Sequence, residues 1–584
     1  MADEQGWRAR AARGWNRTHA VMAGRGHRAT AFKSQPEPRS IGSFARGRQL
    51  AAGNFLFAGY LVEAPGTSIL DIPMPDKAFE MEVHGFEWLD HLAAAGDMAS
   101  RVCAQDWTHD WARRFGKGKG PGWQPDLTGR RLVRWINHAV MLLNGQDRET
   151  SEIFFRVLSH QTNYLARRWK AAEPGQPRFE ALGGLLHAAL SLDGMERHIK
   201  PALRALSREC TQRIDDEGGL PSRNPEELLS VLILLTGLVE ALQEAAIDTP
   251  EEIQRAIREI APTLRILRHA DGGLARFHGG GRGLDGRLDQ ALALSGVRHM
   301  RHKGLGMGFA RLSQGRTTLI ADAARPPSGE ASLNGHASTL AFELTSGRRP
   351  LIVNCGAGET FGSTWRRAGR ATPSHSTLSI EGYSSSRLGG QGIVAGRRTE
   401  LLLDTPKDVT CSRPSTDRSA ALVMSHDGYL RTHGLIHHRR LELAADGRSL
   451  IGDDSLSALT QDAERLFDIA FDRSGMRGVP FAIRFHLHPD VAAELDMGGT
   501  AVSMALKSGE IWIFRHDGTA QLSLAPSVYL ERGRLNPRAT KQIVLSAAAM
   551  DYGTRIGWTL AKAQDTPSHV RDLEVEDDLA ASDR

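Results

Sequence analysis

The chain has little cysteine, little net charge and no long apolar run. Its 584 residues include only four cysteines, which are far apart and form no Cys-x-x-Cys pair, so we predict neither a disulfide framework nor a thiolate zinc site. The apolar stretch LAAGNFLFAGYLVEAPG is broken by Gly and Asn and is too short to span a bilayer. The basic N-terminus has no apolar core of the kind that secretory signals carry. We therefore expect no transmembrane segment and a cytoplasmic location.

The overall composition is that of an ordinary globular protein. Lysine and arginine number 73 against 68 for aspartate and glutamate, which gives a formal net charge of +5. This small excess fits an anionic partner, such as an acidic polysaccharide or nucleic acid, but is also typical of a solvated surface. Apolar residues make up 41% and aromatic residues only 6% of the chain, which excludes a disordered or membrane-embedded class. The length is too great for one hydrophobic core, so we expect two large domains.

The first large domain is predicted to be helical. Between about residues 84 and 270, apolar residues recur at positions i, i+3 and i+4 in roughly seven segments. Consecutive amphipathic helices joined by short loops form helix hairpins, which close into a bundle, a solenoid or a toroid. One helix start is well marked: Asn224 is expected to cap it, Pro225 to occupy its first position and Glu227 to supply the reciprocal carboxylate.

The second large domain is predicted to be a β-sandwich. From about residue 296 the apolar period changes to two, and short strands are separated by Gly-rich turns without intervening helices, which is typical of antiparallel sheets packed face to face. The connector HADGGLARFHGGGRGLDGR lacks the Lys-Ser/Thr pair of a phosphate-binding loop, so no nucleotide site is predicted there. The boundaries expected are a basic N-terminal segment at 1–80, a helical domain at 81–280, a sandwich at 296–565 and an acidic tail at 566–584.

A loop, two strands and a third strand led by histidine form the most specific pattern in the chain. They read NGHASTLAFELTSGRRPLIVNCGAGE followed by RATPSHSTLSIEG, between residues 331 and 382. This pattern, with the helical half before it, resembles the heparinase II/III family of polysaccharide lyases over roughly residues 50–560. The resemblance implies an α+β multidomain fold, in which an N-terminal (α/α) incomplete toroid precedes a C-terminal antiparallel β-sandwich. It also implies an acidic polysaccharide, and not nucleic acid, as the partner; homodimerisation stays open.

Active lyases of this family cleave beside uronic acids by β-elimination. The uronate carboxylate must be neutralised, a base must remove the C5 proton, and an acid must protonate the leaving oxygen. The resemblance implies that Asn, His and Tyr from the toroid and a His from a sandwich loop supply these functions, often beside a structural metal held by His, Asp and His. We expect the substrate to lie in a positively lined trough between the two domains.

Two histidines match family positions on the metal side. His336 stands where the second His of the family's His-x-His loop lies, and His375 leads the later strand. Asn334 replaces the catalytic His of that loop, and Asn354 replaces the metal carboxylate. A zinc or calcium ion on the two histidines would need water or a carboxylate such as Glu359 to complete its ligands; the alternative is a buried, hydrogen-bonded structural pair. His336 and Asn334 are the catalytic candidates of this loop.

On the helical side the resemblance is weaker. Pro177 and Arg178 stand where the family has Asn-His, and Arg178 is expected to neutralise a substrate carboxylate, although arginine cannot accept a proton at neutral pH. Arg223 is expected to grip a uronate or sulfate through two hydrogen bonds, next to Asn224, whose place helix capping also explains. Tyr164 is a weak candidate for the proton acceptor; the alternative is a place in the core stripe of its helix.

The segment STWRRAGRAT supplies two further candidates for substrate binding. An indole at Trp365 and a guanidinium plane at Arg366 suit stacking and ion pairing with an acidic sugar. The alternative for this segment is a solvated loop.

Two functions follow from these residues. The first is a polysaccharide lyase that acts on uronic-acid-containing polysaccharide. The second is a catalytically degenerate relative that binds an acidic envelope or capsule glycan, which the substitutions at Asn334, Asn354 and Arg178 favour. A hydrolase with paired carboxylates is disfavoured because no convincing Asp/Glu pair is found. Polymer-digesting relatives are usually exported, so the cell envelope or periplasm is the alternative location.

Overall fold

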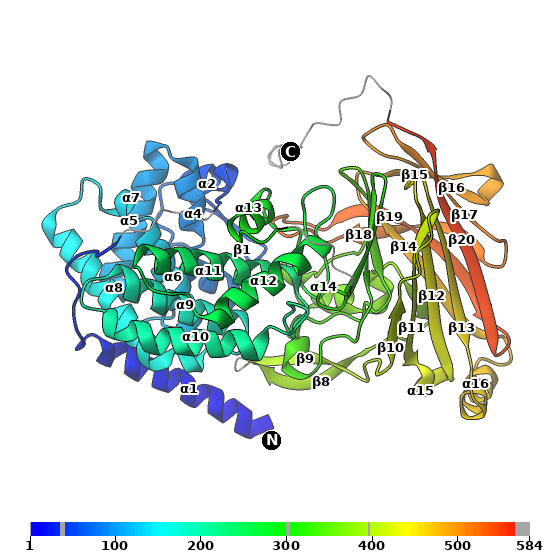
Figure 1. The fold of residues 1–584 in the computed structure, drawn as a ribbon, viewed down its shortest axis with the longest axis horizontal. Helices are drawn as coiled ribbons and strands as arrows, with labels where there is room; N and C mark the ends of the chain where they lie inside the picture. The colour runs from blue at the N-terminus through cyan, green and yellow to red at the C-terminus, as the bar shows by residue number, and fades with distance from the viewer. Residues whose placement is uncertain (1, 35–40, 299–303, 395–396, 567–584) are drawn as a thin grey trace.

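The computed structural model describes residues 2–34, 41–298, 304–394 and 397–566. Helices fill the N-terminal half and antiparallel sheets the C-terminal half (Figure 1). The predicted fold class, a helical domain followed by an antiparallel β-sandwich, is confirmed. The exact domain boundaries at 80, 280 and 296 stay predictions, and the predicted acidic tail lies outside the described residues beyond Thr566.

The helical half contains α-helices and one small β-hairpin. Their bounds are α1 (Ala2–Ala23), α2 (Phe44–Ala51), β1 (Asn54–Phe57), β2 (Tyr60–Glu63), α3 (Lys77–Gly85), α4 (Trp88–Ala95), α5 (Met98–Phe115), α6 (Pro125–Asn137), α7 (Ala139–Leu143), α8 (Arg148–Arg168), α9 (Gln176–Ser191), α10 (Ile199–Arg213), α11 (Pro225–Glu244), α12 (Glu251–Ile266) and α13 (Arg287–Leu294). In the described part of the chain, no helix combines the length and the apolarity that crossing a bilayer requires.

Two segments whose apolar pattern predicts a single helix each, residues 86–115 and 130–143, are each divided into two helices. The first break separates α4 from α5, because Gly96 ends α4 with a φ of 67° and the side chain of Asp97 caps α5 by accepting from the N–H of Ser100. The second separates α6 from α7 at His138. The predicted cap of α11 is confirmed: Asn224 Oδ1 accepts from the N–H groups of Glu226 (3.0 Å) and Glu227 (3.3 Å).

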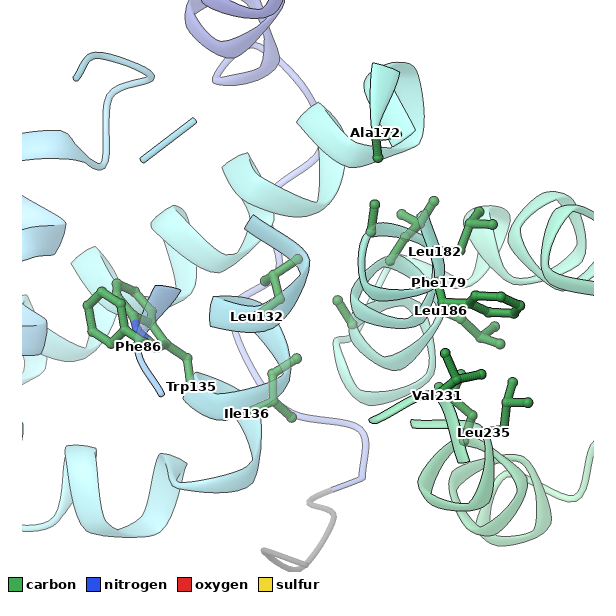
Figure 2. Packing of buried hydrophobic residues seen from close by; sticks show 14 of the residues in the cluster. Phe86, Leu132, Trp135, Ile136, Ala172, Phe179, Leu182, Leu186, Val231 and Leu235 are labelled. Atoms are coloured by element: carbon green, nitrogen blue, oxygen red, sulfur yellow. The ribbon is translucent and has the colours of Figure 1, made fainter. Parts of the chain in front are cut away.

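The helical core is built around a close contact between α6 and α9. A Cβ atom on Gly129 would lie 2.1 Å from the carbonyl oxygen of Glu180, and one on Gly184 would lie 2.4 Å from the Cα of Gly129, so only glycine fits either position. Figure 2 shows side chains around this contact: Leu132, Trp135 and Ile136 from α6, Phe179, Leu182 and Leu186 from α9, and Val231 and Leu235 from α11. Burial of this large apolar area is the main stabilising term for the helical domain.

The sandwich half contains eighteen described strands and three short α-helices. Their bounds are β3 (Phe309–Gln314), β4 (Thr317–Asp322), β5 (Phe342–Ser346), β6 (Arg349–Val353), α14 (Ser363–Arg370), β7 (Leu378–Ile380), β8 (Arg387–Val394), β9 (Arg397–Leu403), β10 (Val409–Ser412), β11 (Ser419–Tyr429), α15 (Leu430–His433), β12 (Leu435–Ala444), β13 (Ser449–Ser457), α16 (Gln461–Arg473), β14 (Val479–Leu487), β15 (Ala492–Asp496), β16 (Ala501–Ala505), β17 (Ile511–His516), β18 (Gln521–Tyr529), β19 (Arg538–Ala549) and β20 (Gly553–Gln564).

These strands form two eight-stranded antiparallel sheets and the separate hairpin β8–β9. One sheet has the order β10-β11-β12-β13-β20-β17-β16-β15, and the other has the order β18-β19-β14-β6-β5-β4-β3, with β7 paired to β14. Aromatic rings fill the space between the sheets: the ring centre of Trp558 lies 4.7 Å from that of Phe485 and 5.9 Å from that of Phe514. The sandwich therefore has a core of its own, separate from that of the helices.

Candidate functional site

His336 and His375 lie together at the side of the sandwich that faces the helical domain. Each follows a short 3₁₀ turn, Gly329–Asn334 and Thr372–Ser374 respectively. His336 Nδ1 lies 3.0 Å from His375 Nε2, and His375 Nδ1 lies 2.9 Å from the carbonyl oxygen of Ala371. Because a carbonyl only accepts, His375 carries its proton on Nδ1, and its Nε2 accepts from His336. The two imidazoles are thus hydrogen-bonded to each other.

A third histidine and an aspartate join this pair from the domain junction. The N–H of His336 donates to His278 Nδ1 at 3.1 Å, and His278 Nε2 lies 3.4 Å from Asp322 Oδ2. Arg223 Nη2 donates to the other oxygen, Asp322 Oδ1, at 2.7 Å. We call these five residues the junction cluster; His278 and Arg223 come from the helical side and the other three from the sandwich.

The junction cluster is almost completely buried, and burial sets its charges. His278, Asp322 and His375 are 0% exposed and His336 is 3% exposed. Burial lowers the pKa of His375 to about 4, and burial together with the charge of His375 lowers the pKa of His336 well below its usual range. Burial acts to raise the pKa of Asp322, but Arg223, the nearby His278 and the hydrogen bond from Ser338 hold it well below its usual range. At neutral pH the histidines are therefore neutral and Asp322 is ionised.

The residues around the histidine pair do not fit a zinc or calcium site. Among the described residues, no group of three or more His, Cys, Asp or Glu side chains is arranged to hold a metal ion. Asn354, at the family's carboxylate position, uses Oδ1 to accept from the N–H of Ser376 at 3.0 Å. Glu359, the carboxylate considered as a further ligand, pairs instead with Arg532 at 3.7 Å.

Asn334 and its loop are held by arginines of α14. Arg366 Nη2 donates to the carbonyl oxygen of Leu333 at 2.7 Å and to Asn334 Oδ1 at 3.0 Å. Arg370, which is buried, donates to three further carbonyl groups of this region, those of Ser332, Gly335 and Glu400. Trp365 is half-buried beside them on the same helix. Arg366, which was predicted to bind substrate, thus donates two hydrogen bonds to the loop that contains Leu333 and Asn334.

Arg223 is the most fully engaged of the predicted binding residues. Besides Asp322, its guanidinium donates to the carbonyl groups of Met307, Gly308, Ala324 and Arg325 at 2.9–3.2 Å. The ring of Phe309 lies 4.5 Å from its central carbon. All of its donor directions are used, and they tie the start of α11 to the first strands of the sandwich. The neighbouring Asn224 uses its side chain to cap α11.

Tyr164 and Arg178 form their hydrogen bonds within the helical domain. Tyr164 is fully buried and its hydroxyl donates to the carbonyl oxygen of Trp123 at 2.8 Å. Burial raises the pKa of its phenol above the usual range, which opposes a role as proton acceptor. Arg178 Nη2 donates to the carbonyl oxygen of Ala172 at 2.9 Å and lies 3.6 Å from Glu209. Neither side chain is hydrogen-bonded to the junction cluster.

Arginines elsewhere on the helical domain and at the junction lie between pairs of carboxylates. The pairs are Arg130 with Glu180 (2.7 Å) and Asp126 (3.7 Å), Arg134 with Asp90 (3.0 Å) and Glu87 (3.3 Å), and Arg532 with Glu226 (2.9 Å) and Glu359 (3.7 Å). The ion pair of Arg532 with Glu226 connects the loop before β19 to α11. Nearby, burial and the charge of Glu87 raise the pKa of Glu82 to about 7. At these positions the charge of each arginine is offset by two carboxylates.

Comparison with known proteins shows which family the chain belongs to. Residues 297–559 match the family model described as heparinase II/III-like, C-terminal. Over 533 residues, 90% of this chain, the sequence is 31% identical to the FtsZ-localized protein C of Caulobacter vibrioides, of which the match covers 89%. The chain belongs to the heparinase II/III-like family. The resemblance predicted from residues 331–382 is thereby confirmed.

Solved structures of this family share the whole fold. The structure of heparinase III matches with a TM-score of 0.67 and 12% identity, covering 93% of this chain and 88% of that one. A heparan sulfate lyase mutant, HepC from Pedobacter heparinus, matches with a TM-score of 0.57 and 13% identity, covering 96% and 90%. At such low identity these matches establish a common heparinase II/III-like architecture and no shared activity.

His278 and Asp322 are the residues that sequence reasoning missed. His278 lies in the Gly-rich connector, and Asp322 is the last residue of β4. The backbone of His278 adopts a φ of 47° directly before Gly279, and no pattern in the sequence marks this. Their role follows only from the contact between the two domains.

Proposed function

We propose that this chain is a heparinase II/III-like protein that acts by binding within an FtsZ-containing division assembly and not by cleaving polysaccharide. The observation that carries the proposal is the junction cluster: the side chains at the family's metal side are buried and hydrogen-bonded to one another. The relative named FtsZ-localized protein C, which matches along most of both chains, supports the cellular context. The proposal places the protein in the cytoplasm, together with FtsZ.

The requirements of β-elimination support the non-catalytic reading. A base must be able to reach the C5 proton, but Asn334 has no basic nitrogen and His336 is 3% exposed. A cation must neutralise the uronate, but the donors of Arg223 are used by four carbonyl groups and Asp322. Supplying either function would require opening the junction and leaving buried charge without a partner, which is costly.

Co-sedimentation tests FtsZ binding directly. The purified chain is centrifuged with FtsZ assembled in the presence of GTP, and with the same FtsZ kept unassembled. We expect the chain to pellet with the assembled protein and to stay in the supernatant when FtsZ is unassembled or absent. A chain that stays in the supernatant in all three mixtures would overturn the proposal.

A polysaccharide lyase for uronic-acid-containing substrates is the second candidate, favoured by the fold and by the meeting of His336 with His375. The related candidate is a protein that binds an acidic envelope or capsule glycan without cleaving it. A panel of acidic glycans, followed by the absorbance of the unsaturated uronate, tests the first; a salt-dependent binding assay with the same panel tests the second. Turnover that is lost in His336→Ala while glycan binding persists would favour the lyase over the FtsZ-binding protein.

A further inference from the structure

An open groove lies between the two sheets at one end of the sandwich. It has a volume of about 460 Å³ and is lined by Glu494 and Leu495 of β15, by Leu524, Ala525 and Pro526 of β18, and by Thr540 and Lys541 of β19. β15 and β18 are each the last strand of their own sheet, and residues of both line the groove. The groove therefore runs between two strand edges that have no strand partner among the described residues.

The backbone of β15 faces this groove. Lys541 Nζ donates to the carbonyl oxygen of Ala493 at 2.7 Å, so this carbonyl points away from β16 and toward the open side. Alternate residues of a strand direct their backbone groups the same way, so the N–H and C=O of Leu495 also face the open edge. The opposite edge is different, because Pro526 interrupts β18 and has no N–H to offer. An added strand would therefore pair with β15 and would displace Lys541 Nζ from the carbonyl oxygen of Ala493.

The side chains of β15 define what such a strand must carry. Leu495 is 50% exposed and lies on the same face as the buried Ala493, so the face turned toward the sandwich interior is apolar. Glu494 and Asp496 are exposed on the other face. Cross-strand neighbours with opposite charge are favourable, and like charges are unfavourable. The partner strand that complements β15 thus alternates apolar residues with basic ones.

We propose that β15 is a docking site for an extended peptide segment with alternating apolar and basic residues, which adds to the sheet as a further strand. The apolar side chains would enter the groove over Leu495 and Leu524, and the basic ones would lie beside Glu494 and Asp496. Main-chain hydrogen bonds to the edge give affinity in this mode of recognition, and the alternate side chains give specificity. The site stands independently of FtsZ binding.

Fluorescence anisotropy with labelled model peptides tests the charge rule. The probes are a peptide of alternating lysine and valine and its counterpart of alternating glutamate and valine, each titrated with the full chain. We expect the lysine peptide to bind and the glutamate peptide to bind at least about tenfold more weakly. In the double variant Glu494→Lys, Asp496→Lys this order should reverse. An unchanged order, or no binding of the lysine peptide to the wild type, would overturn the proposal.

Two further variants test the edge and the groove. Leu495→Pro removes the outward N–H of β15, and Leu524→Asp places a charge in the groove; each should weaken the lysine peptide by about tenfold. Leu459→Asp changes a leucine that is 63% exposed outside the groove and serves as the matched control. Thermal unfolding verifies that each variant is folded. If the control loses binding as strongly as Leu524→Asp, the groove is not the site.

Discussion

Two buried histidine clusters in this chain invite comparison, one at the domain junction and one inside the sandwich. In the second, the N–H of Gly428 donates to His426 Nδ1 at 3.0 Å, His426 Nε2 lies 3.2 Å from His437 Nδ1, and His437 Nε2 lies 2.8 Å from Asp454. Arg439 pairs with the same aspartate at 2.6 and 3.1 Å. We call His426, His437, Asp454 and Arg439 the sandwich cluster.

The two clusters are built on the same plan, although only one occupies a family site. Each links two imidazoles by a hydrogen bond and contains an aspartate that pairs with an arginine and lies close to a histidine nitrogen. In each, burial lowers the pKa of the histidines, while the arginine holds the pKa of the aspartate down. The sandwich cluster lies wholly within one domain. A buried histidine pair near an aspartate is therefore compatible with a purely structural role. The junction cluster differs from the sandwich cluster chiefly because it joins two domains.

Removing the aspartates should give the largest effect. Asp322→Ala and Asp454→Ala each leave a buried arginine without its carboxylate, which costs about 3–5 kcal/mol. Urea denaturation followed by tryptophan fluorescence measures the loss. We expect Asp454→Ala to lower the sandwich transition and Asp322→Ala to separate the helical transition from it, because the pair of Arg223 with Asp322 joins the two domains. A loss below about 1 kcal/mol in Asp322→Ala would show that the junction cluster is not a stabilising one.

Acid should destabilise both clusters in the same direction. The pKa of His375 is about 4 when folded, below its ordinary value of 6.5, so between these values the unfolded chain binds a proton that the folded chain does not. The free energy of unfolding therefore falls as the pH falls through this window, by up to about 1.4 kcal/mol per pH unit for one proton. His375→Gln should make the dependence less steep, as should His437→Gln, when unfolding is measured at several pH values between 4 and 6.5. His27→Gln, at an exposed side chain, is the control and should leave the slope unchanged.

A smaller effect is expected at the edge of the junction cluster. Ser338 Oγ donates to Asp322 Oδ2 at 2.7 Å, and Ser338 is 0% exposed. Ser338→Ala should cost about 1.5–3 kcal/mol, the usual range for a hydrogen bond to a charged group. The exposed Ser363→Ala is the control for this loss of a hydroxyl. Equal denaturation midpoints for the two variants would contradict the importance assigned to Asp322.

Restoring the family's histidine should have the smallest effect. Asn334→His places an imidazole where the resemblance implies the catalytic histidine of active lyases, yet the pair His336–His375 and the arginines of α14 keep their present contacts. We expect no gain of unsaturated uronate on any acidic glycan and a change in unfolding free energy of about 1 kcal/mol or less. Appearance of lyase activity would mean that the junction is open enough for substrate. The junction cluster would then have a role that the sandwich cluster does not have.

The sequence predicts the fold well because hydrophobic periodicity is a local signal. The change from a helical period to a period of two near residue 296 separates the two domains correctly in kind. The cap at Asn224 is also local and is confirmed. The breaks at Gly96 and His138 escaped prediction because the apolar pattern continues across each of them while the backbone does not.

The candidate site was predictable only in part. The family pattern pointed to His336 and His375, which do lie together, but their roles in catalysis or metal binding stay predictions. The partners that determine their environment, His278 and Asp322, come from distant segments, and no spacing rule connects them. The same holds for charge: the net charge of +5 fits an anionic partner, yet Arg130 and Arg532 each meet two carboxylates in space. The net charge of a sequence does not show which charged side chains form ion pairs in the folded protein.

The many bonds of Arg223 have a mechanical consequence. One guanidinium at the start of α11 holds four carbonyl groups and one carboxylate beyond the connector. A pull applied to the helices would reach the sheets through this side chain before the glycine-rich link became taut. A protein anchored at both ends would then carry tension as one stiff body.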